Sequence, residues 1–201
     1  MAYFLVFFPL LGSILGYFVK PFGDRYSEVI TTTLVILSAI LSGVIFYNGI
    51  MHDQYGNYKI LEWISSGNFQ VNWSVNIDPL SSIMLVVVTS VSSLVHIYSI
   101  GYMSHDPNRS RFMSYLSLFT FSMLMLVVSD NFLQLFFGWE GVGLCSYLLI
   151  GFWYKKESAN NAAIKAFLVN RVGDFGFAIG IFLIFYYFGT VNYNEVFIKA
   201  A

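Results

Sequence analysis

Long apolar stretches dominate the chain, and their lengths predict membrane-spanning helices. A spanning helix needs about 20 mostly apolar residues to cross roughly 30 Å of hydrocarbon. Six stretches meet this requirement, at residues 2–19, 29–50, 80–100, 112–128, 132–152 and 162–188. The first four contain no Asp, Glu, Lys or Arg. The pattern therefore predicts an all-α polytopic membrane protein with six transmembrane helices in a single membrane domain over residues 1–201.

The long connection at residues 51–77 follows a different pattern. Between Phe69 and Ile77 apolar and polar residues alternate, and a period of two is typical of a β-strand. Residues 60–64 precede this strand, and the turn-forming residues 65–68 lie between the two segments. We therefore predict a β-hairpin on the outer face between helices two and three, with Trp63 and Trp73 near the membrane interface. The alternative is a loop without regular structure.

The other connections are short and contain helix-capping residues. Asp78 followed by Pro79 is typical of an N-cap with proline at the first helical position. Ser129, Asp130 and Asn131 are cap candidates between helices four and five. Because so few residues join these two helices, we expect them to be antiparallel neighbours.

Composition excludes several other classes of protein. Hydrophobic residues make up 57% of the chain, charged residues only 10%, and the net charge is -1, whereas an ordinary globular domain is about a quarter charged. Disorder and nucleic-acid binding through a basic face are therefore excluded. Cys145 is the only cysteine, so a disulfide scaffold is excluded too. The sequence contains no phosphate loop, metal-ligand spacing or nucleophile triad, and we expect no bound metal.

The basic residues predict an orientation, because short cytoplasmic loops contain an excess of Lys and Arg. Most of them fall on one side of the predicted helices: Lys20, Arg25, Arg109, Arg111, Lys155 and Lys156, with Lys165 and Arg171 near the same end of helix six. The other side has only Lys59 and Lys199. We therefore place the N-terminus outside. No basic segment precedes the first apolar stretch, so we expect helix one to be retained rather than cleaved as a signal peptide.

Glu140 is the main candidate for chemistry, since a charge at membrane depth is costly unless it is paired or hydrated. It lies near the middle of helix five, too deep for its short side chain to reach either surface. Gly138, Gly141 and Gly143 beside it remove side-chain bulk, which permits a close neighbouring helix or leaves room for water. We interpret Glu140 as a protonatable carboxylate facing the bundle interior. A neutral, hydrogen-bonded structural glutamate is the alternative.

Helix six carries three further charged candidates, Lys165, Arg171 and Asp174. Arg171 and Asp174 lie about 60° apart around the helix, so an ion pair within the helix is expected. Lys165 lies on the opposite side and can extend toward the basic end. Spacing alone leaves two roles open, an anchor lysine with a self-neutralising pair, or proton transfer. His96 is the only histidine within a span, and packing or a proton relay are both open for it.

Several of these residues carry a resemblance to a known family. The run from Trp139 to Phe152, WEGVGLCSYLLIGF, follows residues 129–131 (SDN) and precedes residues 165–167 (KAF) and 170–174 (NRVGD). This pattern closely resembles the antiporter-like subunit of respiratory complex I, chain L in bacteria and subunit 5 in mitochondria. The resemblance is strongest from Ile77 to Phe197. Subunits of multisubunit cation/proton antiporters share the Trp-Glu pair but usually diverge after it, so they are the alternative.

The resemblance implies a membrane-arm subunit of NADH:quinone oxidoreductase that couples quinone reduction elsewhere in the complex to proton export. It implies other membrane subunits of complex I as partners and no cofactor in this chain, with NADH, FMN, iron-sulfur clusters and quinone on other subunits. Glu140 matches a glutamate that the family pairs with a lysine of the next helix. Arg171 and Asp174 match a motif expected to support this site, and Lys165 matches another basic position.

The chain departs from the family pattern in length, since family members continue for several hundred residues. The partner lysine, the second helix bundle and the lateral helix have no counterpart among the 201 residues. We expect such a fragment to be inactive alone. It would be the first piece of a split subunit, the product of a truncated gene prediction, or a non-functional remnant. The lysine-containing loops favour a location in a bacterial cytoplasmic membrane, with the mitochondrial inner membrane as the alternative.

Overall fold

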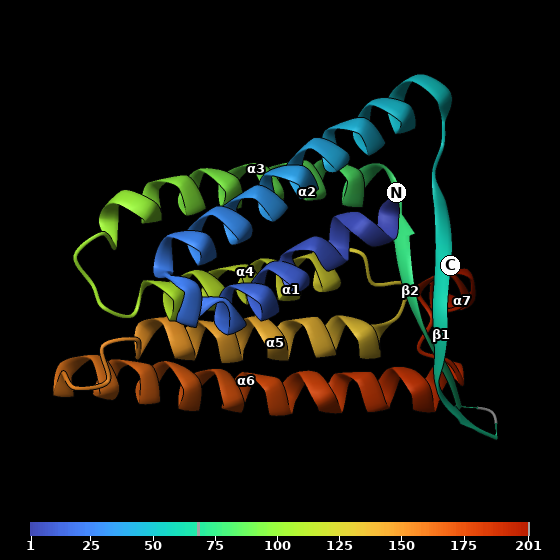
Figure 1. Cartoon of the computed structure of the whole chain (residues 1–201). Helices are drawn as coiled ribbons and strands as arrows, with labels where there is room; N and C mark the ends of the chain where they lie inside the picture. The colour runs from blue at the N-terminus through green and yellow to red at the C-terminus, as the bar shows by residue number, and fades with distance from the viewer. Residues whose placement is uncertain (68, 201) are drawn as a thin grey trace.

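The computed structural model describes residues 1–67 and 69–200. Within this part, six long helices run side by side and a two-stranded sheet stands across one end of them (Figure 1). The helices are α1 (Ala2–Phe18), α2 (Asp24–His52), α3 (Pro79–Tyr102), α4 (Arg109–Val127), α5 (Phe132–Ile150) and α6 (Glu157–Phe188). A short 3-10 turn, η1 (Lys20–Phe22), joins α1 to α2, and the short helix α7 (Tyr193–Ala200) follows α6.

The lengths and apolar composition of these helices suit a membrane. Five of them, α2 to α6, are long and apolar enough to cross one. Helix α1 has 17 residues and is therefore about 26 Å long, near the lower limit for a span. The predicted all-α polytopic fold, with a hairpin between the second and third helices, is confirmed. Helices α2 and α6 begin five residues before the predicted stretches, because polar residues continue the helical backbone beyond the apolar segment.

The order of packing places α6 at the edge of the described group. Helix α1 packs against α2 and α4, α2 packs against α3, α4 against α5, and α5 against α6. Helices α4 and α5 are antiparallel neighbours, as predicted (Figure 1). They approach closely at Gly138, where an added Cβ would lie 2.6 Å from the backbone nitrogen of Leu126. Small residues permit such an approach between helices in lipid.

The buried faces of α2, α3 and α4 are lined by many hydroxyl groups. Six of these hydroxyls donate to the carbonyl four residues earlier in their own helix: Thr31, Thr89, Ser93, Ser114, Thr120 and Ser122. Two hydroxyl pairs also join neighbouring helices, Ser42 with Thr89 at 2.8 Å and Ser92 with Thr120 at 2.5 Å. These hydroxyls therefore satisfy their hydrogen bonds inside the bundle, whereas the buried hydroxyls of Ser27 and Thr32 on α2 have no partner among the described residues.

The hairpin consists of β1 (Gly56–Ser66) and β2 (Phe69–Ile77), paired antiparallel from Gly56 with Ile77 to Ser66 with Phe69. The prediction of a hairpin is confirmed, although Asn68 of the predicted turn lies outside the described residues. The indoles of Trp63 and Trp73 stack with their ring centres 5.0 Å apart. Their position at a membrane interface, and the outer face for the hairpin, stay predictions.

The linker between α4 and α5 and the first turn of α5 attach the hairpin to the helices. The buried Gln134 amide accepts from the Ser74 N–H at 3.1 Å and donates to the Ser74 carbonyl at 2.7 Å. The Asp130 carboxylate accepts from the Asn57 amide at 2.8 Å and from the Ser74 hydroxyl. The Asp130 carbonyl accepts from the backbone N–H of Tyr193 at 3.0 Å, which holds the start of α7. These bonds explain why Ser74 is buried although it occupies a polar position of the alternating pattern.

Two predicted helix caps are present at this end. The Asp78 carboxylate accepts from the backbone N–H of Ser81 at 2.6 Å, and Pro79 is the first residue of α3. At the start of α5, Asn131 is the N-cap and accepts from the backbone N–H of Gln134 at 2.8 Å. Of the three cap candidates, Asn131 therefore caps the helix, while Asp130 binds the hairpin.

Candidate functional site

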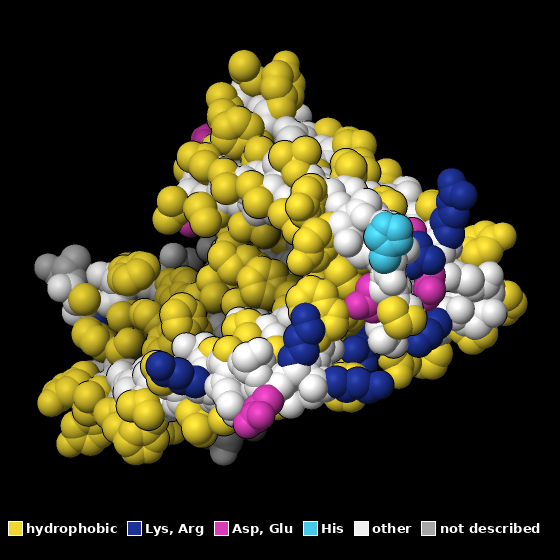
Figure 2. Space-filling model, turned by 90° about the vertical axis from the view of Figure 1, so that its left-hand side faces the viewer, with side chains coloured by type: hydrophobic (Ala, Val, Ile, Leu, Met, Phe, Trp, Pro, Cys, Tyr) yellow, Lys and Arg dark blue, Asp and Glu magenta, His cyan; other side chains and the backbone are white. Residues whose placement is uncertain are grey.

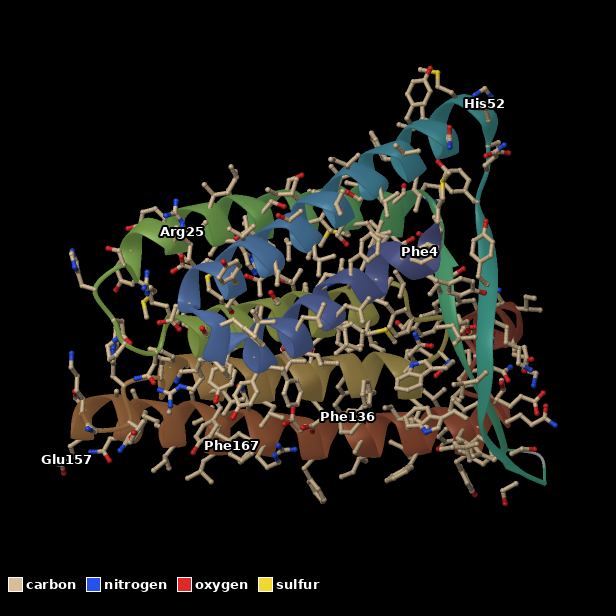
Figure 3. The ribbon with its side chains drawn as sticks, in the orientation of Figure 1. Phe4, Arg25, His52, Phe136, Glu157 and Phe167 are labelled. Carbon is tan, nitrogen blue, oxygen red and sulfur yellow. The ribbon has the colours of Figure 1, made fainter. Side chains whose placement is uncertain are left out.

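An ion pair joins α5 to α6 near the middle of α5. Glu140 is the ninth residue of that helix, about 12 Å along its axis from the first residue. Its Oε2 lies 2.5 Å from Nη1 of Arg171, and the two side chains are 24% and 48% exposed. The guanidinium also lies over the ring of Phe167, labelled in Figure 3, at 4.6 Å from the ring centre. Glu140 therefore faces the seam between α5 and α6.

Asp174 forms the other side of this cluster. Its Oδ2 lies 3.8 Å from Nη1 of Arg171, so the ion pair expected within α6 is present. Its Oδ1 accepts a hydrogen bond from the indole nitrogen of Trp139 at 2.8 Å, and its side chain is 8% exposed. One guanidinium thus stands between two carboxylates, with the Glu140 carboxylate the nearer. When all three groups are ionised, the cluster carries a net charge of -1.

The glycines beside Glu140 have different surroundings. An added Cβ at Gly138 would meet the backbone of Leu126, and one at Gly141 would lie 2.8 Å from the hydroxyl oxygen of Ser122. At Gly143 an added Cβ would meet nothing within 4 Å. Two of the glycines therefore allow α4 to pack closely against α5, and the third leaves open space. Both roles expected from the sequence therefore occur: Gly138 and Gly141 permit a close neighbouring helix, and Gly143 leaves room for water.

The open space at Gly143 is part of a cavity of about 330 Å³ between α4, α5 and α6. Its polar lining comes from Ser146, Asn170 and Asp174, and Trp139 forms part of its wall. This volume is large enough for several water molecules, and polar groups are available to bind them. The carboxylate of Asp174 therefore links the cavity to the arginine that pairs with Glu140.

Lys165 lies outside this cluster. It is exposed on α6, six residues and about 9 Å before Arg171, and forms no ion pair with any residue that the structure describes. His96 lies elsewhere in the bundle and is 0% exposed. Its Nδ1 is 2.8 Å from the Ser92 carbonyl and its Nε2 is 3.0 Å from the Ser117 hydroxyl oxygen. These contacts fit a packing and hydrogen-bonding residue.

The sequence interpretation missed two features of the site. It found no counterpart in this chain for the lysine that the family pairs with this glutamate, and it did not foresee that Arg171 lies beside Glu140. It also gave no role to the indole of Trp139, although this residue stands next to Glu140 in the sequence. Only one signal pointed to such a hydrogen bond. Trp139 is an amphipathic residue inside an apolar helix, and it directly precedes a carboxylate. Among the described residues, no three His, Cys, Asp or Glu side chains gather to hold a metal ion.

Comparisons with known proteins identify the family. Residues 63–113 match the model for the N-terminus of NADH-ubiquinone oxidoreductase (complex I) chain 5. Residues 129–200 match the transmembrane model of NADH:quinone oxidoreductase and the Mrp antiporter. The cluster of Glu140, Arg171 and Asp174 lies within this second match.

Similar proteins extend the match to the whole chain. NADH-quinone oxidoreductase subunit L of Rickettsia felis is 55% identical over 201 residues, which are 100% of this chain and 31% of that protein. NADH-ubiquinone oxidoreductase chain 5 of Triticum aestivum is 54% identical over 202 residues, covering 100% of this chain and 30% of that protein. The chain therefore spans about a third of the length of these relatives.

A solved structure shares the fold at low sequence identity. One chain of the membrane-bound sulfane sulfur reductase, an archaeal respiratory membrane complex, matches with a TM-score of 0.84 and 17% identity. The match covers 97% of this chain and 39% of that one. From the matched family models and the curated relatives together, the chain belongs to the antiporter-like membrane subunits of respiratory complex I, the family of subunit L and chain 5.

Proposed function

We propose that the chain is part of a proton-translocating membrane-arm subunit of NADH:quinone oxidoreductase, in which quinone reduction elsewhere in the complex drives proton export. The observation that carries the proposal is the Glu140–Arg171 ion pair, 2.5 Å between the charged atoms, at the seam of two apolar helices. A charge inside a membrane is retained only where it is paired or hydrated. Both conditions are available here, since a cavity of about 330 Å³ lies beside the cluster.

The ion pair can control whether Glu140 holds a proton. While the guanidinium of Arg171 is close, its positive charge stabilises the ionised carboxylate. A rotation of the Arg171 side chain away from Glu140 and toward Asp174, on the same helix, removes this stabilisation, and the carboxyl group then takes up a proton. Return of the arginine releases that proton. Water in the cavity beside Gly143 is the proposed medium for proton uptake and release.

The remaining candidates have supporting roles in this proposal. Asp174 offers Arg171 a second anionic partner, and the Trp139 indole keeps that carboxylate in position. Lys165 is proposed as a further proton carrier on α6, nearer the basic end. The redox groups, namely NADH, FMN, iron-sulfur clusters and quinone, are assigned to other subunits, and this chain is proposed to bind no cofactor.

The protein belongs in a membrane, and its place and orientation there are proposals. We infer a bacterial cytoplasmic membrane with the N-terminus outside, with the mitochondrial inner membrane as the alternative. Support for the orientation comes from the gathering of Lys and Arg at one end of the helices, which Figure 2 shows facing the viewer. The hairpin and the N-terminus lie at the other end (Figure 1). Labelling of a cysteine introduced at exposed Gln70 by a membrane-impermeant reagent tests it, and labelling only from the inside contradicts it.

The central experiment replaces Glu140 with glutamine in the assembled complex. Glu140→Gln keeps the size of the side chain and a hydrogen-bond acceptor but removes the titratable group. Since a positioned proton-transfer group contributes about 10²–10⁴-fold to a rate, we expect proton pumping and coupled NADH oxidation to fall at least about tenfold. Glu62→Gln on the exposed hairpin is the matched control and should leave both rates unchanged. Unchanged pumping in an assembled Glu140→Gln complex contradicts the proposed role.

A cation/proton antiporter subunit is the second candidate, because the model matched by residues 129–200 describes both NADH:quinone oxidoreductase and the Mrp antiporter. Proton flux that depends on an added cation, in vesicles without an electron donor, favours this candidate. A role confined to assembly, or none at all, is favoured if the chain does not co-purify with the redox subunits.

A further inference from the structure

A second cavity lies at the basic end of the helices, away from Glu140. Its volume is about 410 Å³, and it opens between α4, α5 and the start of α6. Arg111 of α4, the tyrosines Tyr115 and Tyr147, and Asn160 of α6 provide its polar lining. None of the residues that line it also lines the cavity beside Asp174. This cavity therefore lies outside the proposed proton route through Glu140 and Asp174.

The positive charge of Arg111 is not neutralised by any carboxylate within 4 Å in the described part of the chain. Arg109, two residues earlier, pairs with Glu28 at 3.2 Å. Arg111 instead donates from Nη2 to the carbonyl of Phe152 at 3.1 Å, and its guanidinium lies 4.7 Å from the ring centre of Phe152.

The guanidinium of Arg111 is also held in place with spare donors. The ring of Tyr154 lies 5.3 Å from its central carbon. Its Nε is buried and has no hydrogen-bond partner among the described residues. A guanidinium has five N–H donors and no acceptor, and the one hydrogen bond to Phe152 leaves other donors available to an anion. The geometry therefore favours an anion with several oxygens, and the planar fork of arginine matches phosphate.

The surroundings of the cavity point to a phosphate that belongs to a lipid. Trp153 and Tyr154 follow Phe152 and are exposed, and aromatic residues of this kind concentrate at membrane interfaces. Lys155 and Lys156 come next, and Lys and Arg side chains gather over this end of the molecule (Figure 2). In Figure 3, Arg25 and Glu157 mark the same end.

An apolar surface leads from the cavity toward the middle of the membrane. Ile164 lines the cavity, and Leu168 lies one turn further along the same face of α6. Their side chains are 49% and 60% exposed. We propose that the cavity binds the phosphate of an anionic phospholipid, with Arg111 as its main ligand and the acyl chains along this face of α6. Basic pockets between transmembrane helices are suited to such headgroups.

The experiment measures lipid binding to the full chain in detergent by native mass spectrometry. Delipidated protein is titrated with dioleoyl phosphatidylglycerol and, separately, with dioleoyl phosphatidylcholine. We expect the first phosphatidylglycerol to bind at least about tenfold more tightly than phosphatidylcholine. Arg111→Gln should weaken phosphatidylglycerol binding about tenfold, the amount expected for one charge-assisted contact. Arg25→Gln, an exposed arginine at the same end, should leave the affinity unchanged.

Each other outcome of the titration overturns the proposal. Equal affinity of the wild type and Arg111→Gln for phosphatidylglycerol shows that Arg111 is not the ligand. Displacement of the lipid by millimolar inorganic phosphate shows a site for free anions rather than for lipid. If Arg111→Gln does not fold, Arg111→Lys decides the question, since it keeps the charge but loses the planar fork. An Arg111→Lys affinity equal to that of the wild type then contradicts the role of the guanidinium.

Discussion

Replacement of Gln134 by leucine removes the amide that joins α5 to strand β2. Gln134 is 0% exposed, and Ser74, whose backbone it binds, is 1% exposed. The change therefore leaves a buried N–H and a buried carbonyl of Ser74 without their partner, while leucine fills nearly the same volume. Each unsatisfied buried group costs about 1–3 kcal/mol, so the free energy of unfolding should fall by roughly 2–6 kcal/mol.

The assay uses the reactivity of a single thiol. Cys145 is the only cysteine of the chain, and it is 1% exposed, so a fluorogenic thiol reagent reacts with it only when α5 opens away from α4. For a chain of this length a loss of 1 kcal/mol corresponds to a shift of about 2–4 °C. Gln134→Leu should therefore lower the midpoint of thermal labelling in detergent by at least about 4 °C.

Gln70→Leu is the matched control for this experiment. Gln70 lies on the same strand, but its side chain is exposed and forms no hydrogen bond with the described residues. Its replacement should leave the midpoint close to that of the wild type. The reasoning is refuted if Gln134→Leu and Gln70→Leu have the same midpoint, because the Gln134 amide would then add nothing to stability.

Two further predictions concern the packing of α5 and the start of α7. Gly138→Ala places a methyl group 2.6 Å from the backbone nitrogen of Leu126, so it should lower stability by about 1–3 kcal/mol in the same thiol assay. Gly143→Ala, which meets nothing within 4 Å, should leave stability unchanged, and equal losses would contradict the steric argument. Burial, and then the nearby negative charge of Asp130, raise the pKa of Tyr193 above its usual value of 10. The unfolded chain therefore ionises at Tyr193 first, and the contribution of this residue to stability is lost as the pH rises above about 10. Tyr193→Phe should reduce this alkaline loss of stability, measured by thiol labelling at increasing pH. An unchanged loss would contradict the prediction.

The sequence predicted the helices and the hairpin because both depend on local patterns. An apolar stretch of about 20 residues and a strict alternation are visible in any single segment. The helix α7 was not predicted, because it is short and is held by hydrogen bonds that the Asp130 and Val191 carbonyls accept from Tyr193 and Phe132, rather than by an apolar period of its own. The additional turns of α2 and α6 were missed for a related reason, as hydropathy does not detect polar helical ends.

The candidate site shows where sequence spacing stops being informative. The Arg171–Asp174 pair was predictable because three residues along one helix bring side chains together. The Glu140–Arg171 pair joins residues 31 positions apart, and its formation depends on how α5 and α6 pack. The hydrophobic periodicity of a helix does not predict the angle at which it packs against another helix. The choice of arginine as the partner of Glu140 therefore required the three-dimensional structure.

The hydroxyl groups on α2, α3 and α4 bear on how the chain is built during synthesis. Thr31, Thr89 and Ser114 each donate to a carbonyl of their own helix, so these groups need no neighbour to satisfy their donors. A helix can therefore leave the translocon and enter lipid singly without exposing these three donors unpaired to hydrocarbon. Assembly of the bundle can then follow insertion as a separate step, in which docking of the helices supplies partners to other groups, such as the Ser38 hydroxyl that donates to the Leu5 carbonyl of α1.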